Sequence, residues 1–213
     1  MASEGETMEV KRTTRERIVI ESLKLFAKKG YDGVSMREIA AAVGIKGASL
    51  YNHFKGKEDI FHAIFTEMTT QYDSAAMMAN VPLQEDEQAV QTFQGIKEEQ
   101  LLAMAEGIFS FFTQNEFAVL FRRFLVSEQN RSETAAKYYR EYYLEAPIKF
   151  QTELFGGLQQ FGEFAGYKPE MIALHFYSPV FYLLNKFDRG YTYEDCLCEV
   201  KEHVHCFCKL YQR

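Results

Sequence analysis

The sequence predicts an all-α protein, and three observations support this fold class. Apolar residues recur at helical spacing along the 213-residue chain, runs that alternate apolar and polar residues are nearly absent, and Gly30, Gly44 and Pro82 fall where helices should end. No run reaches the roughly 18 uninterrupted apolar residues of a membrane-spanning helix. The acidic first six residues lack the basic and then apolar pattern of a secretory signal. We therefore expect a soluble protein of the cytoplasm, without a membrane partner.

The first two helices have clear end signals. The first is predicted over residues 13–29, with Gly30 in the position of its C-terminal cap. Its apolar stripe comprises Val19, Leu23, Phe26 and Ala27. A second, short helix should begin at Ser35, because Ser35 and Glu38 fit a capping box, in which each side chain bonds the other residue's backbone N–H. It should stop at Gly44, since glycine adopts the left-handed conformation of a tight turn.

A third short helix is predicted over residues 46–54. Two short helices joined by a glycine-containing turn make a helix-turn-helix, whose second helix enters the major groove of DNA. The charge distribution agrees, because residues 11–57 carry eleven Lys and Arg against four Asp and Glu, whereas residues 58–213 carry thirteen against twenty-three. Salt screens charges beyond a Debye length of about 8 Å, so a local basic face can attract phosphates in a chain of net charge −6.

The remainder of the chain is also predicted to be helical. A long helix should lead away from the motif over residues 57–78, and the clearest break follows at residues 80–87, because Pro82 cannot sit inside a helix. Further helices are predicted over residues 88–113, 116–129, 132–161, 169–188 and 193–210. The helix over residues 132–161 should be kinked at Pro147.

Residues 44–58, which read GIKGASLYNHFKGKE, resemble the signature of the TetR family of bacterial repressors. The likeness extends upstream through Ile18, Phe26, Gly30, Tyr31, Ile39 and Ala40. It covers roughly residues 13–60, about a quarter of the chain. Lys46 departs from the family pattern, which often has a capping Ser or Thr there. The resemblance implies a DNA-binding transcriptional regulator, most simply a repressor that binds a palindromic operator as a dimer, and neither an enzyme nor a cofactor protein.

The resemblance also implies roles for the residues of the motif. The helix over residues 46–54 would be the recognition helix in the major groove. The residues expected to approach base edges are Lys46, Gly47, Ser49 and Asn52, and Ala48 lies among them in the DNA-binding set. Phosphate contacts are expected from Tyr51, His53 and Lys57, and from Ser35 and Arg37 at the start of the second helix. Tyr51 and His53 could instead pack or cap. The basic residues at the start of the chain either form a solvated face or make further DNA contacts; they are Lys11, Arg12, Arg15 and Arg17.

We assign residues 1–57 to the DNA-binding domain, with residues 1–10 disordered, and residues 58–213 to a helical effector-binding and dimerisation domain. The second domain is crowded with aromatic residues, which form either a core or a cavity with polar tips. By resemblance, such a cavity would bind a small effector, and the candidate residues are Met104, Phe112, Tyr142 and His175. The two C-terminal helices should pair with their symmetry mates. Their outward-facing residues are expected to be Phe181, Leu184, Leu197, Val200, Val204 and Phe207.

A run of cysteine and histidine residues lies in the last predicted helix. It contains Cys196, Cys198, His203, His205, Cys206 and Cys208. Residues two apart on a helix project from nearly opposite faces, so neither Cys-x-Cys pair can chelate one ion. We favour small buried packing residues over a metal or redox role. An all-α enzyme and a helical module that binds a partner protein are the alternatives to a regulator, but no pair of nucleophile and base stands out.

Overall fold

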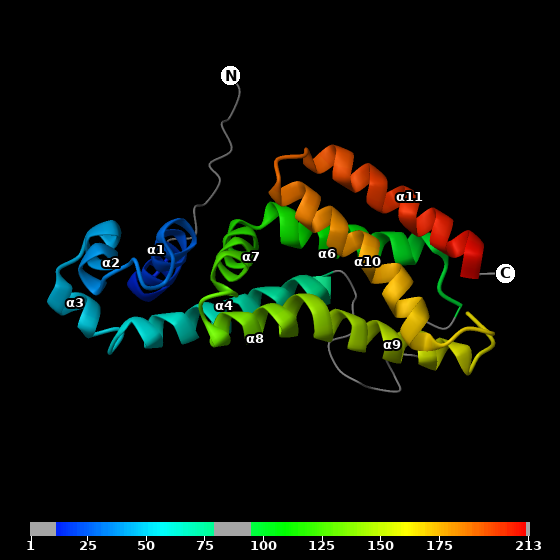
Figure 1. The fold of residues 1–213 in the computed structure, drawn as a ribbon, viewed down its shortest axis with the longest axis horizontal. Helices are drawn as coiled ribbons and strands as arrows, with labels where there is room; N and C mark the ends of the chain where they lie inside the picture. Colours follow the sequence, from blue (N-terminus) through cyan, green and yellow to red (C-terminus); the bar gives the residue numbers. More distant parts are fainter. Residues whose placement is uncertain (1–11, 79–94, 212–213) are drawn as a thin grey trace, which may run out of the picture. The chain divides into compact units, whose positions relative to one another are not determined.

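The computed structural model describes residues 12–78 and 95–211, and every regular element in these ranges is a helix (Figure 1). The all-α prediction is therefore confirmed. The chain forms two compact units, Met1–Thr66 and Glu67–Arg213. The predicted disorder of residues 1–10, the predicted break at residues 80–87 and the predicted helix start at residue 88 lie outside the described residues.

The first unit begins with α1, Thr14–Lys29, which buries Ile18, Leu23 and Phe26. Thr13 caps α1 through a capping box with Glu16 that the sequence analysis did not identify. Gly30 ends the helix with a φ of 76°, and its N–H donates to the carbonyl of Phe26. The apolar stripe and the terminal glycine thus act as predicted.

The helices α2, Met36–Val43, and α3, Gly47–Tyr51, follow in the same unit (Figure 1). Ser35 and Glu38 form the predicted capping box. Gly44 ends α2 in the left-handed region, with a φ of 76° and a ψ of 33°. The helix α3 is shorter than predicted, because the chain turns after Tyr51: the amides of His53 and Phe54 both donate to the carbonyl of Leu50.

The helix α4, Lys57–Met78, has the predicted bounds and contributes residues to both units. The second unit continues with α6, Glu98–Gln114; α7, Glu116–Glu128; α8, Glu133–Arg140; the π-helix η1, Glu141–Glu145; α9, Ala146–Gln159; α10, Pro169–Asp188; and α11, Tyr193–Tyr211. Within this unit, α10 packs on α6, α9 and α11, and α11 packs on α6. Phe109, Phe155 and Phe207 are buried in its core.

The helix predicted over residues 132–161 is continuously helical from Glu133 to Gln159, but the π-helix η1 divides it into α8 and α9. The kink was expected at Pro147, which instead stands in the first turn of α9. Proline has no N–H to donate to the carbonyl four residues earlier, that of Tyr143. The hydroxyl of Tyr177 donates to this carbonyl at 2.9 Å. The wide π turn and the hydroxyl from α10 together accommodate the proline.

The predicted outward face of the two C-terminal helices is also largely wrong. Leu184, Val200, Val204 and Phe207 are all buried within the unit. The stripe on α11 turns inward because it packs against α6 and α10, which supply its apolar partners. The large apolar residues that α10 does expose are Met171, Leu174 and Tyr182.

The four cysteines of α11 are free, and they divide by burial. Cys196 and Cys208 are buried, as expected of packing residues, whereas Cys198 and Cys206 are exposed, which corrects the prediction for this second pair. Burial raises the pKa of the Cys208 thiol to about 11. Among the described residues, no group of three or more His, Cys, Asp or Glu side chains is placed to hold a metal ion. None of the described helices is both long and apolar enough to cross a membrane.

Candidate DNA interface and ligand pocket

The helix α3 has one anchored side and one solvent-facing side. Leu50 within α3 and Phe54 just after it are buried in the first unit. The next residue along α3, Tyr51, is exposed, with an exposed fraction of 58%. The other candidate DNA contacts that are exposed are Lys46, Gly47, Ala48, Asn52 and His53, and Ser49 is half-buried. The residues of α3 and its flanks that were predicted from the motif are therefore accessible to solvent, Ser49 only partly.

The turn before α3 sets the direction of this surface. The amide of Gly44 donates to the carbonyls of Ala40 and Ala41, and the amide of Ile45 donates to the carbonyl of Ala40 at 3.0 Å. Lys46 is the N-cap of α3 but makes no side-chain capping bond, since it has no acceptor to offer the helix amides. A methyl group built on Gly47 would meet no atom within 4 Å. Nothing within the protein thus requires a glycine at this position.

Ser35 and Lys57, two of the predicted phosphate contacts, also make structural bonds. The hydroxyl of Ser35 lies 2.9 Å from one carboxylate oxygen of Glu38, and the Lys29 ammonium donates to the other at 2.7 Å. These bonds, with the Lys29 bond the strongest cause, lower the pKa of Glu38 to about 2. The Lys57 ammonium donates to the carbonyl of Tyr31 at 2.7 Å and lies 4.3 Å from the centre of its ring.

Arginines of α1, which the sequence left open as a solvated face or as DNA contacts, hold the motif together. The Arg17 guanidinium donates to the carbonyl of Val43 at 2.6 Å, at the C-terminal end of α2. The Arg15 guanidinium lies 4.8 Å from the centre of the Phe54 ring. Sequence reasoning missed both contacts, although the free carbonyls at a helix end are a general signal for a cationic partner. Arg37 is exposed near the start of α2.

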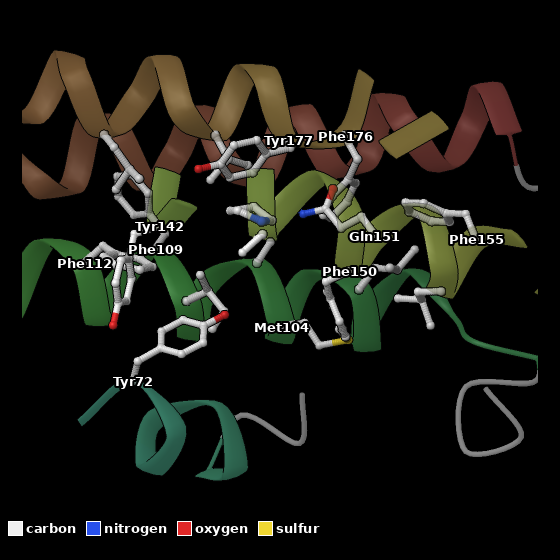
Figure 2. Close-up of a pocket in the computed structure, with 18 of the residues that line it drawn as sticks. Tyr72, Met104, Phe109, Phe112, Tyr142, Phe150, Gln151, Phe155, Phe176 and Tyr177 are labelled. Carbon is white, nitrogen blue, oxygen red and sulfur yellow. The ribbon is translucent and has the colours of Figure 1, made fainter. Parts of the chain in front are cut away.

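The second unit contains a cavity of about 310 Å³ lined mainly by apolar side chains (Figure 2). The lining comes from the second-unit part of α4, from α6, from η1 with α9, and from α10. Three of the predicted ligand-binding candidates, Met104, Phe112 and Tyr142, line it. The fourth, His175, lies outside the lining, since it is exposed on α10 and bonds the hydroxyl of Tyr211.

Sequence reasoning missed the polar residues of the cavity, which are Tyr72, Glu141, Gln151 and Tyr177. Figure 2 shows the amide end of Gln151 extending toward the middle of the pocket. Its oxygen is buried and has no hydrogen-bond partner among the described residues. Burial raises the pKa values of Tyr72 and Tyr177, so their hydroxyls stay neutral. Tyr142 is bonded to the hydroxyl of Thr69.

A buried ion pair supports the wall of this cavity. The side chain of Arg122 on α7 is 2% exposed. It donates to the two carboxylate oxygens of Asp188 at 2.6 and 2.8 Å, and to the carbonyl of Phe112 at 2.6 Å. The bidentate pair cancels the charge of the guanidinium, and the third bond holds a residue that lines the cavity.

The first unit, with its braced pair of short helices and an exposed α3, is that of a helix-turn-helix DNA-binding protein. Residues 18–64 match the family model described as bacterial regulatory proteins, tetR family. This domain is therefore similar to the DNA-binding domain of the TetR family. The resemblance stated from residues 44–58 is therefore confirmed.

The curated relatives match over a short part of the chain. The biofilm operon icaADBC HTH-type negative transcriptional regulator IcaR of Staphylococcus epidermidis is 43% identical over 47 residues. This match covers 22% of the chain and 25% of IcaR, so the chain aligns with about a quarter of that relative's length.

Solved structures match over nearly the whole chain. A TetR-family regulator of Mesorhizobium loti has a TM-score of 0.66 at 19% identity, covering 93% of this chain and 96% of that one. A transcriptional regulator of Saccharomonospora viridis, solved in complex with choline, has a TM-score of 0.63 at 17% identity, covering 92% and 95%. At these identities the likeness establishes the fold of the chain.

Proposed function

We propose that the protein is a transcriptional repressor of the cytoplasm, and not an enzyme. It binds a palindromic operator as a homodimer and leaves it when a small, largely apolar or aromatic effector enters the cavity of the second unit. The observation that carries the proposal is the exposed surface of α3, anchored by Leu50 and Phe54, in a domain similar to that of the TetR family. The name of IcaR as a negative regulator supports repression, and the choline complex of the Saccharomonospora protein supports a small effector.

On DNA, α3 lies in the major groove, which is about 12 Å wide and admits a helix. Lys46, Gly47, Ser49 and Asn52 face base edges, and Tyr51, His53, Lys57, Ser35 and Arg37 contact phosphates. Contacts to bases specify the sequence, whereas contacts to phosphates position the domain. The absence of a side chain at Gly47, which the fold itself does not need, lets the backbone approach the DNA closely.

The proposed dimer uses the apolar residues that α10 exposes. Met171, Leu174 and Tyr182 are each more than two-fifths exposed and lie on one helix. Pairing this face with its symmetry mate buries it and places two copies of α3 on half-sites about 34–36 Å apart. An effector that binds better to a form with another spacing lowers the affinity for the operator without touching a base contact. In this proposal, the helix α4, which contributes residues to both units, transmits the effect of the ligand to the DNA-binding unit.

The proposal is tested by selecting bound sequences from a random duplex library and titrating salt. We expect a palindrome with half-sites one helical turn or a multiple of it apart, and a steep fall in affinity with salt. Asn52→Ala should relax specificity at one base position, with a cost of about 1–3 kcal/mol, whereas Tyr51→Ala should weaken binding to all sequences alike. Lys209→Ala, at an exposed lysine of the second unit, is the control. Salt-insensitive binding without a palindrome would refute the dimeric repressor.

A further inference from the structure

The ionisable side chains that line the cavity include an acidic group but no basic one. Among the residues that the structure describes, no Lys, Arg or His contributes to the lining, and Glu141 supplies the single carboxylate. The cavity's tyrosines stay neutral, because burial raises the pKa values of Tyr72, Tyr142 and Tyr177. The buried cation behind the wall, Arg122, is already paired with Asp188. The cavity therefore has a net negative lining.

The π-helix places this carboxylate at the cavity. Along η1 and α9 the lining residues come in pairs: 141 and 142, 146 and 147, 150 and 151, and 154 and 155. The first step between pairs is five residues, which is one π turn, and the next two steps are four residues, as on one face of an α-helix. The wide turn thus keeps Glu141 in register with Gln151 on the cavity side. Glu141 is exposed and Gln151 is half-buried, so the carboxylate lies at the rim and the amide lies further in.

The cavity contains hydrogen-bond acceptors beside two groups that can donate, the hydroxyl of Tyr72 and the amide NH2 of Gln151. The amide oxygen of Gln151 has no partner among the described residues. The hydroxyl of Tyr177 donates its hydrogen bond to the carbonyl of Tyr143, so the lone pairs of the Tyr177 oxygen are left as acceptors. Within the part of the chain that the structure describes, no ion pair uses the carboxylate of Glu141. A ligand that donates hydrogen bonds or has a positive charge satisfies these groups, whereas a carboxylate or phosphate meets no cation.

Aromatic rings make up much of the remaining wall. They belong to Tyr72, Phe109, Phe112, Tyr142, Phe150, Phe155, Phe176 and Tyr177 (Figure 2). The faces of aromatic rings attract cations through their quadrupoles, an interaction worth about 0.5–2 kcal/mol each and strongest where water is excluded. Tyr72 and Phe112, with ring centres 5.8 Å apart, belong to two different helices of this wall.

We propose that the effector is a lipophilic cation: an amine or quaternary ammonium with an apolar body that fills the cavity and a charged end between Glu141 and the aromatic rings. This inference rests on the proposed function only where it calls the ligand an effector, because the chemistry of the cavity does not depend on DNA binding. The negative lining and the aromatic wall each favour a positively charged end over a neutral or an anionic one.

The experiment compares three probes with the same chain and different ends: decyltrimethylammonium, decanol and decanoate. Binding to the full-length protein is measured by calorimetry without DNA, below the micelle concentrations. We expect the cation to bind most tightly and decanoate most weakly. Glu141→Gln should weaken binding of the cation about five-fold and leave decanol binding unchanged, since it removes one charge at an exposed site. Glu145→Gln, at an exposed glutamate of the same π-helix outside the lining, is the matched control and should change nothing.

The outcomes separate this inference from the proposed function. If decanol or decanoate binds as tightly as the cation, if none of the probes binds, or if Glu141→Gln keeps the full cation affinity, the assignment of a cationic ligand is overturned, and operator binding by the protein is unaffected. If the cation binds as expected but the protein selects no DNA sequence, the ligand class stands and the repressor function fails. If both hold, the cation should also release the selected operator.

Discussion

The bonds of Arg122 allow a quantitative test of the second unit. The change Arg122→Met keeps the apolar bulk of a side chain that is 2% exposed and removes three short hydrogen bonds. Asp188, whose side chain is 16% exposed, then loses its bidentate partner. Breaking a buried pair from one side costs about 3–5 kcal/mol, because it leaves an uncompensated charge. Arg123 still approaches Asp188 at 3.5 Å, so we expect the lower end of this range.

The double variant separates the charge from the packing. Adding Asp188→Leu removes the unpaired carboxylate and leaves only the carbonyl of Phe112 without its donor, which costs about 1–3 kcal/mol. The double variant should therefore be more stable than Arg122→Met alone, which is the sign of a strong coupling between the two sites. Arg123→Met is the control, since its side chain is 51% exposed and its pair with Asp188 is worth at most about 1 kcal/mol.

The assay is urea unfolding followed by circular dichroism, with the midpoint and the slope compared between variants. Two results would refute the reasoning. One is a loss of less than about 1 kcal/mol in Arg122→Met, which would mean that water or another cation compensates Asp188. The other is a double variant that is less stable than Arg122→Met. That result would mean that removing the unpaired Asp188 carboxylate gives no relief.

Three further predictions concern other sites. Gly47→Ala should leave the stability unchanged or raise it by up to about 1 kcal/mol, because a methyl group meets no atom there, and should weaken operator binding; Gly56→Ala, also in open space, should not affect binding. Tyr177→Phe should cost about 1–3 kcal/mol in urea unfolding, since the buried carbonyl of Tyr143 loses its donor. Burial lowers the pKa of His203, so the unfolded chain binds more protons; stability should fall as the pH drops below 6.5, and His203→Gln should flatten this dependence.

The sequence predicted the elements whose ends have a local cause. The bounds of α4 and α10 were predicted to the residue, and α10 begins with Pro169, a residue favoured in the first helical turn. The capping box of Ser35 and the left-handed Gly44 were likewise readable, because these signals involve residues a few positions apart. The exposed surface of α3 follows from the same local pattern, since buried Leu50 and Phe54 are one helical turn apart.

Features that depend on partners distant in sequence were not readable. Arg122 and Asp188 are 66 residues apart, and nothing local marks either as buried. The orientation of α11 was predicted wrongly because an apolar stripe predicts a buried face but not which helix covers it. His175 was a wrong choice for the cavity lining for a related reason: its neighbour Phe176 faces the cavity, and a shift of one residue turns a side chain by about 100°.

The π-helix shows how one local signal becomes a feature of the cavity only through tertiary contact. Pro147 marks a disturbance in the sequence, but a kink, a helix end and a π turn are all compatible with a missing N–H. The hydroxyl of Tyr177, 34 residues from Tyr143, supplies the donor to the Tyr143 carbonyl. Because Tyr177 also lines the cavity, the same contact fixes the turn that brings Glu141 to the rim. Tyr177→Phe should therefore lower stability, and it should also weaken cation binding, because it loosens this turn and removes an acceptor oxygen from the cavity.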